Sequence, residues 1–194
     1  MNKKLVFATL ASLVLNACQP SAPEVPPLAG TKIGGPFALV NETGAAVSNK
    51  DFDGQYRLMY FGYTFCPDVC PVDVQRLMQG VAKFEAAHPK AAAKLQPLFI
   101  SVDPQRDTPP VLIQFTDAFH PRLIGLTGTP AQIAATAKTF AVVYQKGEGT
   151  SPTAYLVDHS RTAILYGPKG EPIAIISNDG APDTIAAELA RWIK

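Results

Sequence analysis

The sequence predicts one α/β domain in which a mixed β-sheet is flanked by helices. Short apolar runs that suit buried strands alternate with segments whose apolar residues recur at helical spacing. The last quarter breaks this alternation with two short apolar runs around a turn at 168–171, followed by a closing helix. The chain has 194 residues and is 47% apolar, which is enough for one well-cored domain and short for two.

The first half of the domain predicts a hairpin, a strand and a helix. Residues 37–48 hold two short apolar segments around 41–44, a hairpin pattern. Residues 55–63, QYRLMYFGY, predict a strand buried on both faces. Pro71 suits the first helical position, which would make Cys70 the cap residue. The helix then continues to His88 through apolar residues at helical spacing: Val74, Leu77, Met78, Val81 and Phe84.

The second half of the domain predicts two strand–helix pairs, then a hairpin and a last helix. Residues 96–103 and 122–128 predict strands, and each is followed by a helix that begins after a threonine cap, Thr108 or Thr129, with proline behind it. Residues 162–167 and 172–177 predict an antiparallel hairpin, and Asp183 is expected to cap the last helix. This order is the thioredoxin-like plan: a central mixed β-sheet flanked by helices, with an N-terminal β-hairpin extension.

The N-terminus predicts export. Residues 1–17 join two lysines to an apolar run and end in a small residue before Cys18, the layout of an export signal. The stretch LNAC resembles a bacterial lipoprotein signal, cut before the cysteine, whose sulfur then carries lipid. The alternatives are a secreted protein cut elsewhere and a retained anchor. We expect residues 18–36, rich in Pro, Gly and Ala, to be a flexible tether to a domain of residues 37–194.

These features predict a membrane-anchored lipoprotein on the periplasmic side of the cell envelope. Removing residues 1–17 takes away two lysines and no acid, so the formal charge changes from +1 to −1. A nearly neutral chain without a basic block gives no electrostatic case for nucleic acid.

Cys66 and Cys70 are the only cysteines left if Cys18 carries lipid. Their C-x-x-x-C spacing at a helix start brings both side chains within reach of one ion and also lets the loop close a disulfide. The helix dipole is expected to favour the thiolate of Cys70. Two thiolates suit Cu(I), and an added imidazole would allow Cu(II) as well.

His159 is the best histidine candidate. His88 and His120 precede prolines at predicted helix ends, where they can interact with terminal carbonyls. His159 comes just before the strand 162–167, in a loop expected to face the cysteines. A rival register makes residues 153–158 the strand and moves His159 on the order of 20 Å away. We favour the first because residues 162–177 form two strands of matched length, which leaves 147–158 as an irregular segment.

Four motifs occur in a characteristic order: YFGYTFCPDVCP at 60–71, ISVDPQRDTP at 100–109, FHPRLIGLTGT at 119–129 and YLVDHS at 155–160. With them the chain resembles the Sco/SenC family, extracytoplasmic copper-binding thioredoxin-like proteins that help assemble the dinuclear copper centre of cytochrome c oxidase. The resemblance implies Cys66, Cys70 and His159 as copper ligands, with Asp158 orienting the imidazole or contacting a partner. Family members often have histidine where this chain has Phe65, so one possible nitrogen donor is absent.

The leading functional hypothesis is therefore a metallochaperone that carries copper, as Cu(I) and Cu(II), to the copper-site subunit of cytochrome c oxidase or to another periplasmic copper protein. The alternative is a thiol-disulfide oxidoreductase that uses Cys66 and Cys70 to reduce exported partners. A permanent disulfide would close only a tiny loop and leave His159 unexplained. Asp103 and Asp107 are interpreted as residues that fix the loop 102–109.

Overall fold

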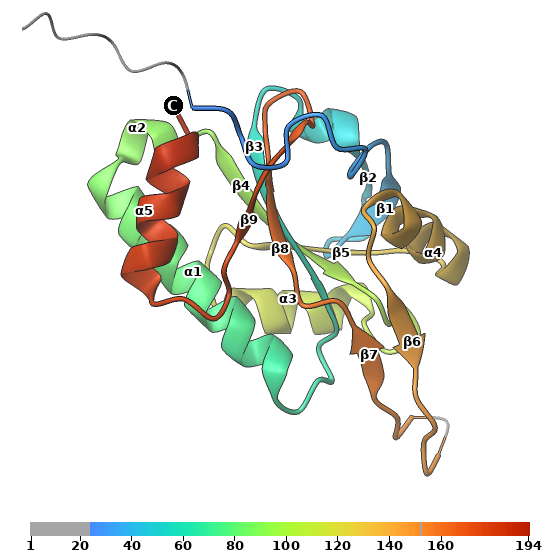
Figure 1. Ribbon diagram of the computed structural model, residues 1–194. Coiled ribbons are helices and arrows are strands. Elements are labelled where there is room, and N and C mark those ends of the chain that lie inside the picture. The colour runs from blue at the N-terminus through green and yellow to red at the C-terminus, as the bar shows by residue number, and fades with distance from the viewer. Residues whose placement is uncertain (1–23, 152) are drawn as a thin grey trace, which may run out of the picture.

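The computed structural model describes residues 24–151 and 153–194 (Figure 1). Seven strands form one mixed sheet in the order β2-β1-β5-β4-β3-β8-β9, and β6 and β7 form a separate two-stranded sheet. The strands are β1 (Ala38–Asn41), β2 (Ala46–Ser48), β3 (Tyr56–Gly62), β4 (Leu95–Ser101), β5 (Ile124–Thr127), β6 (Tyr144–Lys146), β7 (Val157–His159), β8 (Ala163–Tyr166) and β9 (Pro172–Ile176). The helices are the 3-10 helix η1 (Asn49–Phe52), α1 (Val69–Ala87), α2 (Pro89–Ala92), α3 (Pro109–Asp117), α4 (Pro130–Thr139) and α5 (Pro182–Trp192).

Helices cover both faces of the large sheet, which confirms the predicted thioredoxin-like architecture (Figure 1). One hydrophobic cluster joins α1, α3 and α5 to one face, around Phe84, Phe99 and Leu189. A second cluster joins α4 and η1 to the other face, around Phe61, Ile133 and Phe140. The N-terminal hairpin is also present, since β1 pairs antiparallel with β2.

The central strand β3 sets the position of the site. It pairs parallel with β4 and antiparallel with β8, and Tyr60 lies opposite Ala163. The favoured register is thus confirmed and the rival register is wrong, because β8 and β9 form the hairpin of the large sheet. Antiparallel pairing places the segment that enters β8 beside the end of β3, where the cysteine loop begins.

Two predicted helix caps are wrong. Helix α1 begins at Val69 after Asp68, so Cys70 lies inside its first turn and is not the cap. Pro71 is tolerated there because the first-turn N–H groups need no partner within the helix. Helix α5 begins at Pro182 after Ala181, and Asp183 pairs with Lys83 at 2.6 Å instead of capping.

The threonine caps have different outcomes. Thr129 and Gln132 form the reciprocal hydrogen bonds of a capping box at the start of α4. Thr108 occupies the cap position of α3, but its side chain makes no capping hydrogen bond.

The segment expected to be irregular, residues 147–158, ends in β7, which pairs antiparallel with β6 (Figure 1). Each of these strands has three residues, too few for an alternating pattern to stand out in the sequence. This small sheet carries His159 at its inner end.

Residues 24–36 contact the domain although they belong to the expected tether. The Leu28 N–H donates to the Ile173 carbonyl at 3.0 Å and the Gly34 N–H to the Thr139 carbonyl at 2.9 Å. Residues 1–23 lie outside the described residues, so the export signal, the lipid site at Cys18 and a tether over residues 18–23 stay predictions. No helix in the described part of the chain combines the length and apolar character needed to cross a bilayer.

The close contact between α1 and α5 requires a glycine at position 80. A Cβ added at Gly80 would lie 2.5 Å from Ile185 Cβ on α5. Replacing Gly80 by Ala should therefore lower the free energy of unfolding by about 1–2 kcal/mol in urea denaturation, because overpacking outweighs the gain in helix propensity. The exposed Gln79→Ala on the same helix should change it by less than about 0.5 kcal/mol. A more stable Gly80→Ala protein would contradict this account.

Candidate metal centre

The cysteine loop between β3 and α1 is fastened by a buried carboxylate. Asp107 is 0% exposed and accepts hydrogen bonds from the Thr64 N–H, the Thr64 hydroxyl at 2.7 Å and the Ser101 hydroxyl at 2.6 Å. Burial raises the pKa of the Asp107 carboxyl, although these hydrogen bonds oppose the shift. The interpretation of Asp107 as a loop-fixing residue is confirmed.

Asp103 is fastened in a similar way. It accepts the Tyr155 hydroxyl at 2.7 Å and the Arg106 guanidinium at 2.5 Å, and so ties the loop 102–109 to the segment before β7. Burial and the bond to Asp103 raise the pKa of Tyr155 to about 12, so its hydroxyl stays a donor at neutral pH.

Cys66 and Cys70 are both buried free thiols, and the Cys70 N–H donates to Cys66 Sγ at 3.4 Å. Burial would raise the pKa of Cys66, but hydrogen bonds from the backbone of Cys70, Asp68 and Val69 reverse this and lower it. Burial raises the pKa of Cys70. The expectation that the helix start favours the Cys70 thiolate is therefore wrong, because the free amides face Cys66.

His159 reaches the cysteine pair from 89 residues away. Its Nε2 lies 3.1 Å from Cys70 Sγ. Its Nδ1 lies 3.0 Å from the Ser160 carbonyl, which can only accept, so Nδ1 carries the proton and the Nε2 lone pair faces the sulfur. Burial lowers the pKa of His159, which keeps the ring neutral at pH 7. A neutral imidazole with a free lone pair is the form that binds metal.

The imidazole also packs against two tyrosines. The Tyr60 and Tyr63 rings meet it edge to face, with centroids at 6.3 and 5.8 Å. These aromatic neighbours were not predicted from the sequence, because both residues fit the pattern of a buried strand.

Cys70 contacts both other candidates, but the three ligands do not yet surround one point. Among the described residues, no three His, Cys, Asp or Glu side chains are arranged to hold a metal ion. Asp158 is exposed and lies next to His159 on β7, so the two side chains point to opposite faces of the strand. The Ser160 carbonyl, and not Asp158, holds Nδ1.

The other two histidines lie apart from the cysteines. His88 is exposed after α1, with its ring 5.5 Å from that of Phe84. His120 is buried, accepts the Arg122 N–H at 3.2 Å and lies 3.3 Å from Glu85. The His120 ring thus contacts a backbone N–H and the Glu85 carboxylate, and not the terminal carbonyls that were expected.

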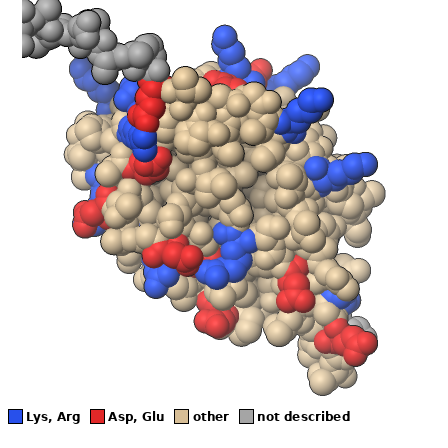
Figure 2. Space-filling view, viewed as in Figure 1, with Lys and Arg blue, Asp and Glu red and all other residues tan. Residues whose placement is uncertain are grey.

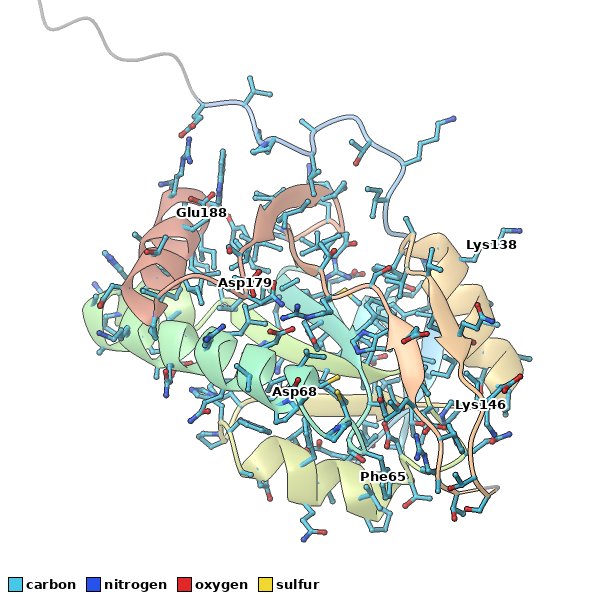
Figure 3. All side chains as sticks on the ribbon, turned by 60° about the horizontal axis from the view of Figure 1, so that its bottom comes forward. Phe65, Asp68, Lys138, Lys146, Asp179 and Glu188 are labelled. Carbon is cyan, nitrogen blue, oxygen red and sulfur yellow. The ribbon has the colours of Figure 1, made fainter. Side chains whose placement is uncertain are left out.

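The surroundings of the cysteine loop are partly open. Phe65 is 49% exposed, and the Arg106 guanidinium lies 4.9 Å from its ring. Figure 3 shows Phe65 near α3 and Asp68 at the start of α1, at the same end of the domain. Figure 2 shows acidic and basic side chains side by side in the lower half of this face, an uncharged area above them, and basic side chains along the upper right edge.

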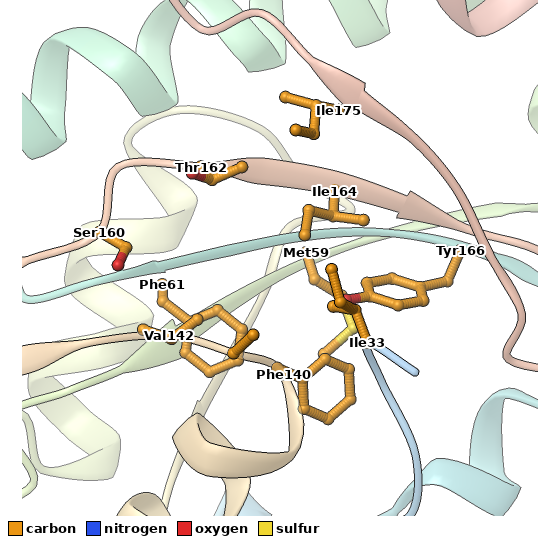
Figure 4. Close-up of a pocket in the computed structure, with 11 residues that line it drawn as sticks. Ile33, Met59, Phe61, Phe140, Val142, Ser160, Thr162, Ile164, Tyr166 and Ile175 are labelled. Carbon is orange, nitrogen blue, oxygen red and sulfur yellow. The ribbon is translucent and has the colours of Figure 1, made fainter. Parts of the chain in front are cut away.

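A separate apolar cavity of about 190 Å³ is lined by residues that include Met59, Phe61, Phe140 and Ile164 (Figure 4). Its lining contains no cysteine, histidine, acid or base. The cavity offers one thioether, Met59, but no thiol or imidazole, and it is not part of the candidate centre.

A family model and several known proteins match most of this sequence. The SCO1/SenC family model matches residues 26–194. The chain is 45% identical to protein SenC of Rhodobacter capsulatus over 166 residues, which are 85% of this chain and 72% of that protein. It spans about half the length of the mitochondrial SCO1 and SCO2 homologues that it also matches.

Solved structures of Sco proteins have the same fold as this chain. The structure of Bradyrhizobium japonicum ScoI with copper bound matches with a TM-score of 0.75 and 35% identity, over 83% of this chain and 99% of that one. BsSco, described as a member of the Sco family of cytochrome c oxidase assembly proteins with a disulfide switch, matches with a TM-score of 0.62 and 26% identity, over 80% of this chain and 90% of that one.

The opposite pKa shifts of the two thiols predict unequal reactivity. At pH 7 and limiting iodoacetamide, Cys66 should be alkylated at least about tenfold faster than Cys70, because alkylation requires the thiolate and one pKa unit changes its fraction about tenfold. Peptide mass spectrometry of the reduced protein measures both rates. Faster alkylation of Cys70 would contradict the arrangement of amides around Cys66.

Proposed function

Because the chain belongs to the SCO1/SenC family, we propose that it is a copper metallochaperone that delivers copper to the dinuclear copper centre of cytochrome c oxidase during assembly. The observation that carries the proposal is the 3.1 Å approach of His159 Nε2 to Cys70 Sγ. The relatives support it, since a copper-bound structure is known for ScoI and BsSco is described within a family of oxidase assembly proteins.

Cys66, Cys70 and His159 are the proposed copper ligands. Two soft sulfurs suit Cu(I), and the imidazole nitrogen extends the set to Cu(II). His159 is already neutral with Nε2 turned to the sulfur, so only the thiols must release protons on binding. Cys66 would then turn toward the side of Cys70 that faces His159.

The two thiols suit different parts of a transfer. Cys66 lies in the loop before α1, next to the exposed Pro67 and Asp68, whereas Cys70 is fixed in the helix at 0% exposure. An incoming thiolate of the client would replace Cys66 first, while Cys70 and His159 still hold the ion. The client in this proposal is the copper-site subunit of the oxidase or another periplasmic copper protein.

The proposed location is the periplasmic side of the cell envelope, with a lipid on Cys18 holding the protein at the membrane. The support is the signal-like pattern of residues 1–18. Such an anchor would keep the metal centre near a membrane-bound client.

The ligand set predicts separate losses for the two copper states. Titration of the reduced full chain should show that His159→Ala lowers Cu(II) affinity by at least about 100-fold, since losing a ligand exceeds the effect of losing its supporting partner. Cu(I) affinity should fall much less, because both thiolates remain. Cys66→Ser should weaken both. The exposed His88→Ala is the matched control and should change neither. Unchanged Cu(II) binding by His159→Ala would disprove this ligand set.

A thiol-disulfide oxidoreductase is the second candidate, favoured by the lowered pKa of Cys66 beside a second free thiol. The Cys66 thiolate would attack a partner disulfide and release one partner thiolate. Cys70 would then attack the mixed disulfide, releasing the second partner thiolate and leaving a Cys66–Cys70 disulfide. The partner gains two electrons and the cysteine pair loses them.

The two candidates differ in their need for His159. If the protein is a reductase, His159→Ala should retain the rate of disulfide reduction and Cys66→Ser should lose it. The rate is measured on insulin, with an added small thiol that reduces the Cys66–Cys70 disulfide after each turnover. Negligible reduction by the wild type, together with Cu(II) binding that depends on His159, would exclude the enzyme. Rapid reduction with His159-independent copper binding would favour it.

A further inference from the structure

Asp73 is a wholly buried carboxylate next to the candidate copper ligands. It lies on α1, three residues after Cys70, and is 0% exposed. The Tyr60 hydroxyl donates to Asp73 Oδ2 at 2.9 Å. Arg161 donates from Nε to Oδ2 at 2.9 Å and from Nη2 to Oδ1 at 2.7 Å. This two-bond arrangement fixes the orientation of both groups as well as their separation.

Arg161 lies two residues after His159, in the connection from β7 to β8. The ion pair therefore joins the segment that carries His159 to the helix that carries Cys70. The opposite edge of this segment is held by the residue that precedes β6, since the Ser160 N–H donates to the Val143 carbonyl at 2.9 Å. β7 is not part of the seven-stranded sheet, so the pairing of β8 with β3 brings this segment near the cysteines but leaves the orientation of the His159 ring to other contacts.

We infer that the Asp73–Arg161 ion pair is a positioning device that holds the imidazole of His159 against Cys70. This inference rests on the proposed copper site. Arg161 makes no hydrogen bond to Cys66, Cys70 or His159 among the described contacts, so it acts through the backbone of residues 159–161. Tyr60 completes the device, because its hydroxyl binds Asp73 while its ring meets the His159 ring edge to face.

A purely structural ion pair is the alternative, and it has a different signature. It would lower stability when removed but leave the copper ligands in place. A positioning pair changes copper binding only while His159 is present. The double-mutant cycle between Arg161 and His159 separates the two.

The test titrates the reduced full chain with Cu(II) and follows the thiolate-to-copper absorption. Arg161→Met should lower Cu(II) affinity about 10- to 100-fold, the range typical of losing a group that supports a metal ligand. In the His159→Ala background the same change should have no further effect. Arg161→Lys keeps the charge but loses the planar two-bond geometry, so it should give an intermediate loss in a protein that retains a charged partner for Asp73.

Arg122→Met is the matched control. Its side chain is 35% exposed, against 42% for Arg161, and it pairs with Glu85 at 2.7 Å away from the cysteines. The control should lower the thermal midpoint without changing Cu(II) affinity or absorption. Equal affinity in Arg161→Met and wild type would overturn the inference. So would a loss of the same size with and without His159.

A second readout needs no copper. In the metal-free protein, amide hydrogen exchange of residues 157–160 should be faster in both Arg161 variants and unchanged in Arg122→Met. Unchanged exchange in the Arg161 variants would overturn the inference. If His159→Ala binds Cu(II) as the wild type does, the proposed ligand set fails, and the exchange measurement still decides whether Arg161 positions His159.

Discussion

The antiparallel pairing of β8 with β3 is the constraint on which the candidate centre depends. β3 leads into the cysteine loop, and Ala163 at the start of β8 lies opposite Tyr60 near the end of β3. Any residue shortly before Ala163 must therefore lie beside the cysteines. This pairing brings His159 to Cys70 across 89 residues of sequence. The buried carboxylates Asp73 and Asp107 refine this placement from the two sides of the loop.

Burial and backbone amides have opposite effects on the pKa of the two thiols: the amides prevail at Cys66 and burial prevails at Cys70. Cys66 precedes the helix and faces its free N–H groups, so its thiolate is stabilised despite burial. Cys70 is one turn further in and wholly buried, so desolvation dominates. One helix start thus lowers the pKa of the outer thiol and leaves the inner thiol, whose pKa is raised, in contact with the imidazole. A soft cation would relieve the unfavourable burial of the inner sulfur's charge, which links this asymmetry to metal binding.

The large elements and their order could be predicted because each has a strong local pattern, as in the buried strand 55–63 or the matched runs of 162–177. The helix starts at Cys70 and Asp183 were mispredicted because a proline at any first-turn position is compatible with several caps. β6 and β7 were missed because three-residue strands show no periodicity. The contact between Cys70 and His159 depends on which segment pairs with β3. The sequence predicted it only because residues 162–167, and not 153–158, were assigned to that strand.

Asp73 illustrates why a charge can be retained where an apolar residue would pack. It falls on the apolar stripe of α1, between Cys70 and Val74, and a carboxylate there loses its hydration. A buried ion pair is weak evidence for stability, since well-packed apolar groups often stabilise a fold as well or better. Apolar contacts, however, are non-directional and would let the 160–162 connection slide along the helix. Two parallel hydrogen bonds to Arg161 allow one orientation, and a ligand held within hydrogen-bond range of a sulfur needs that restriction.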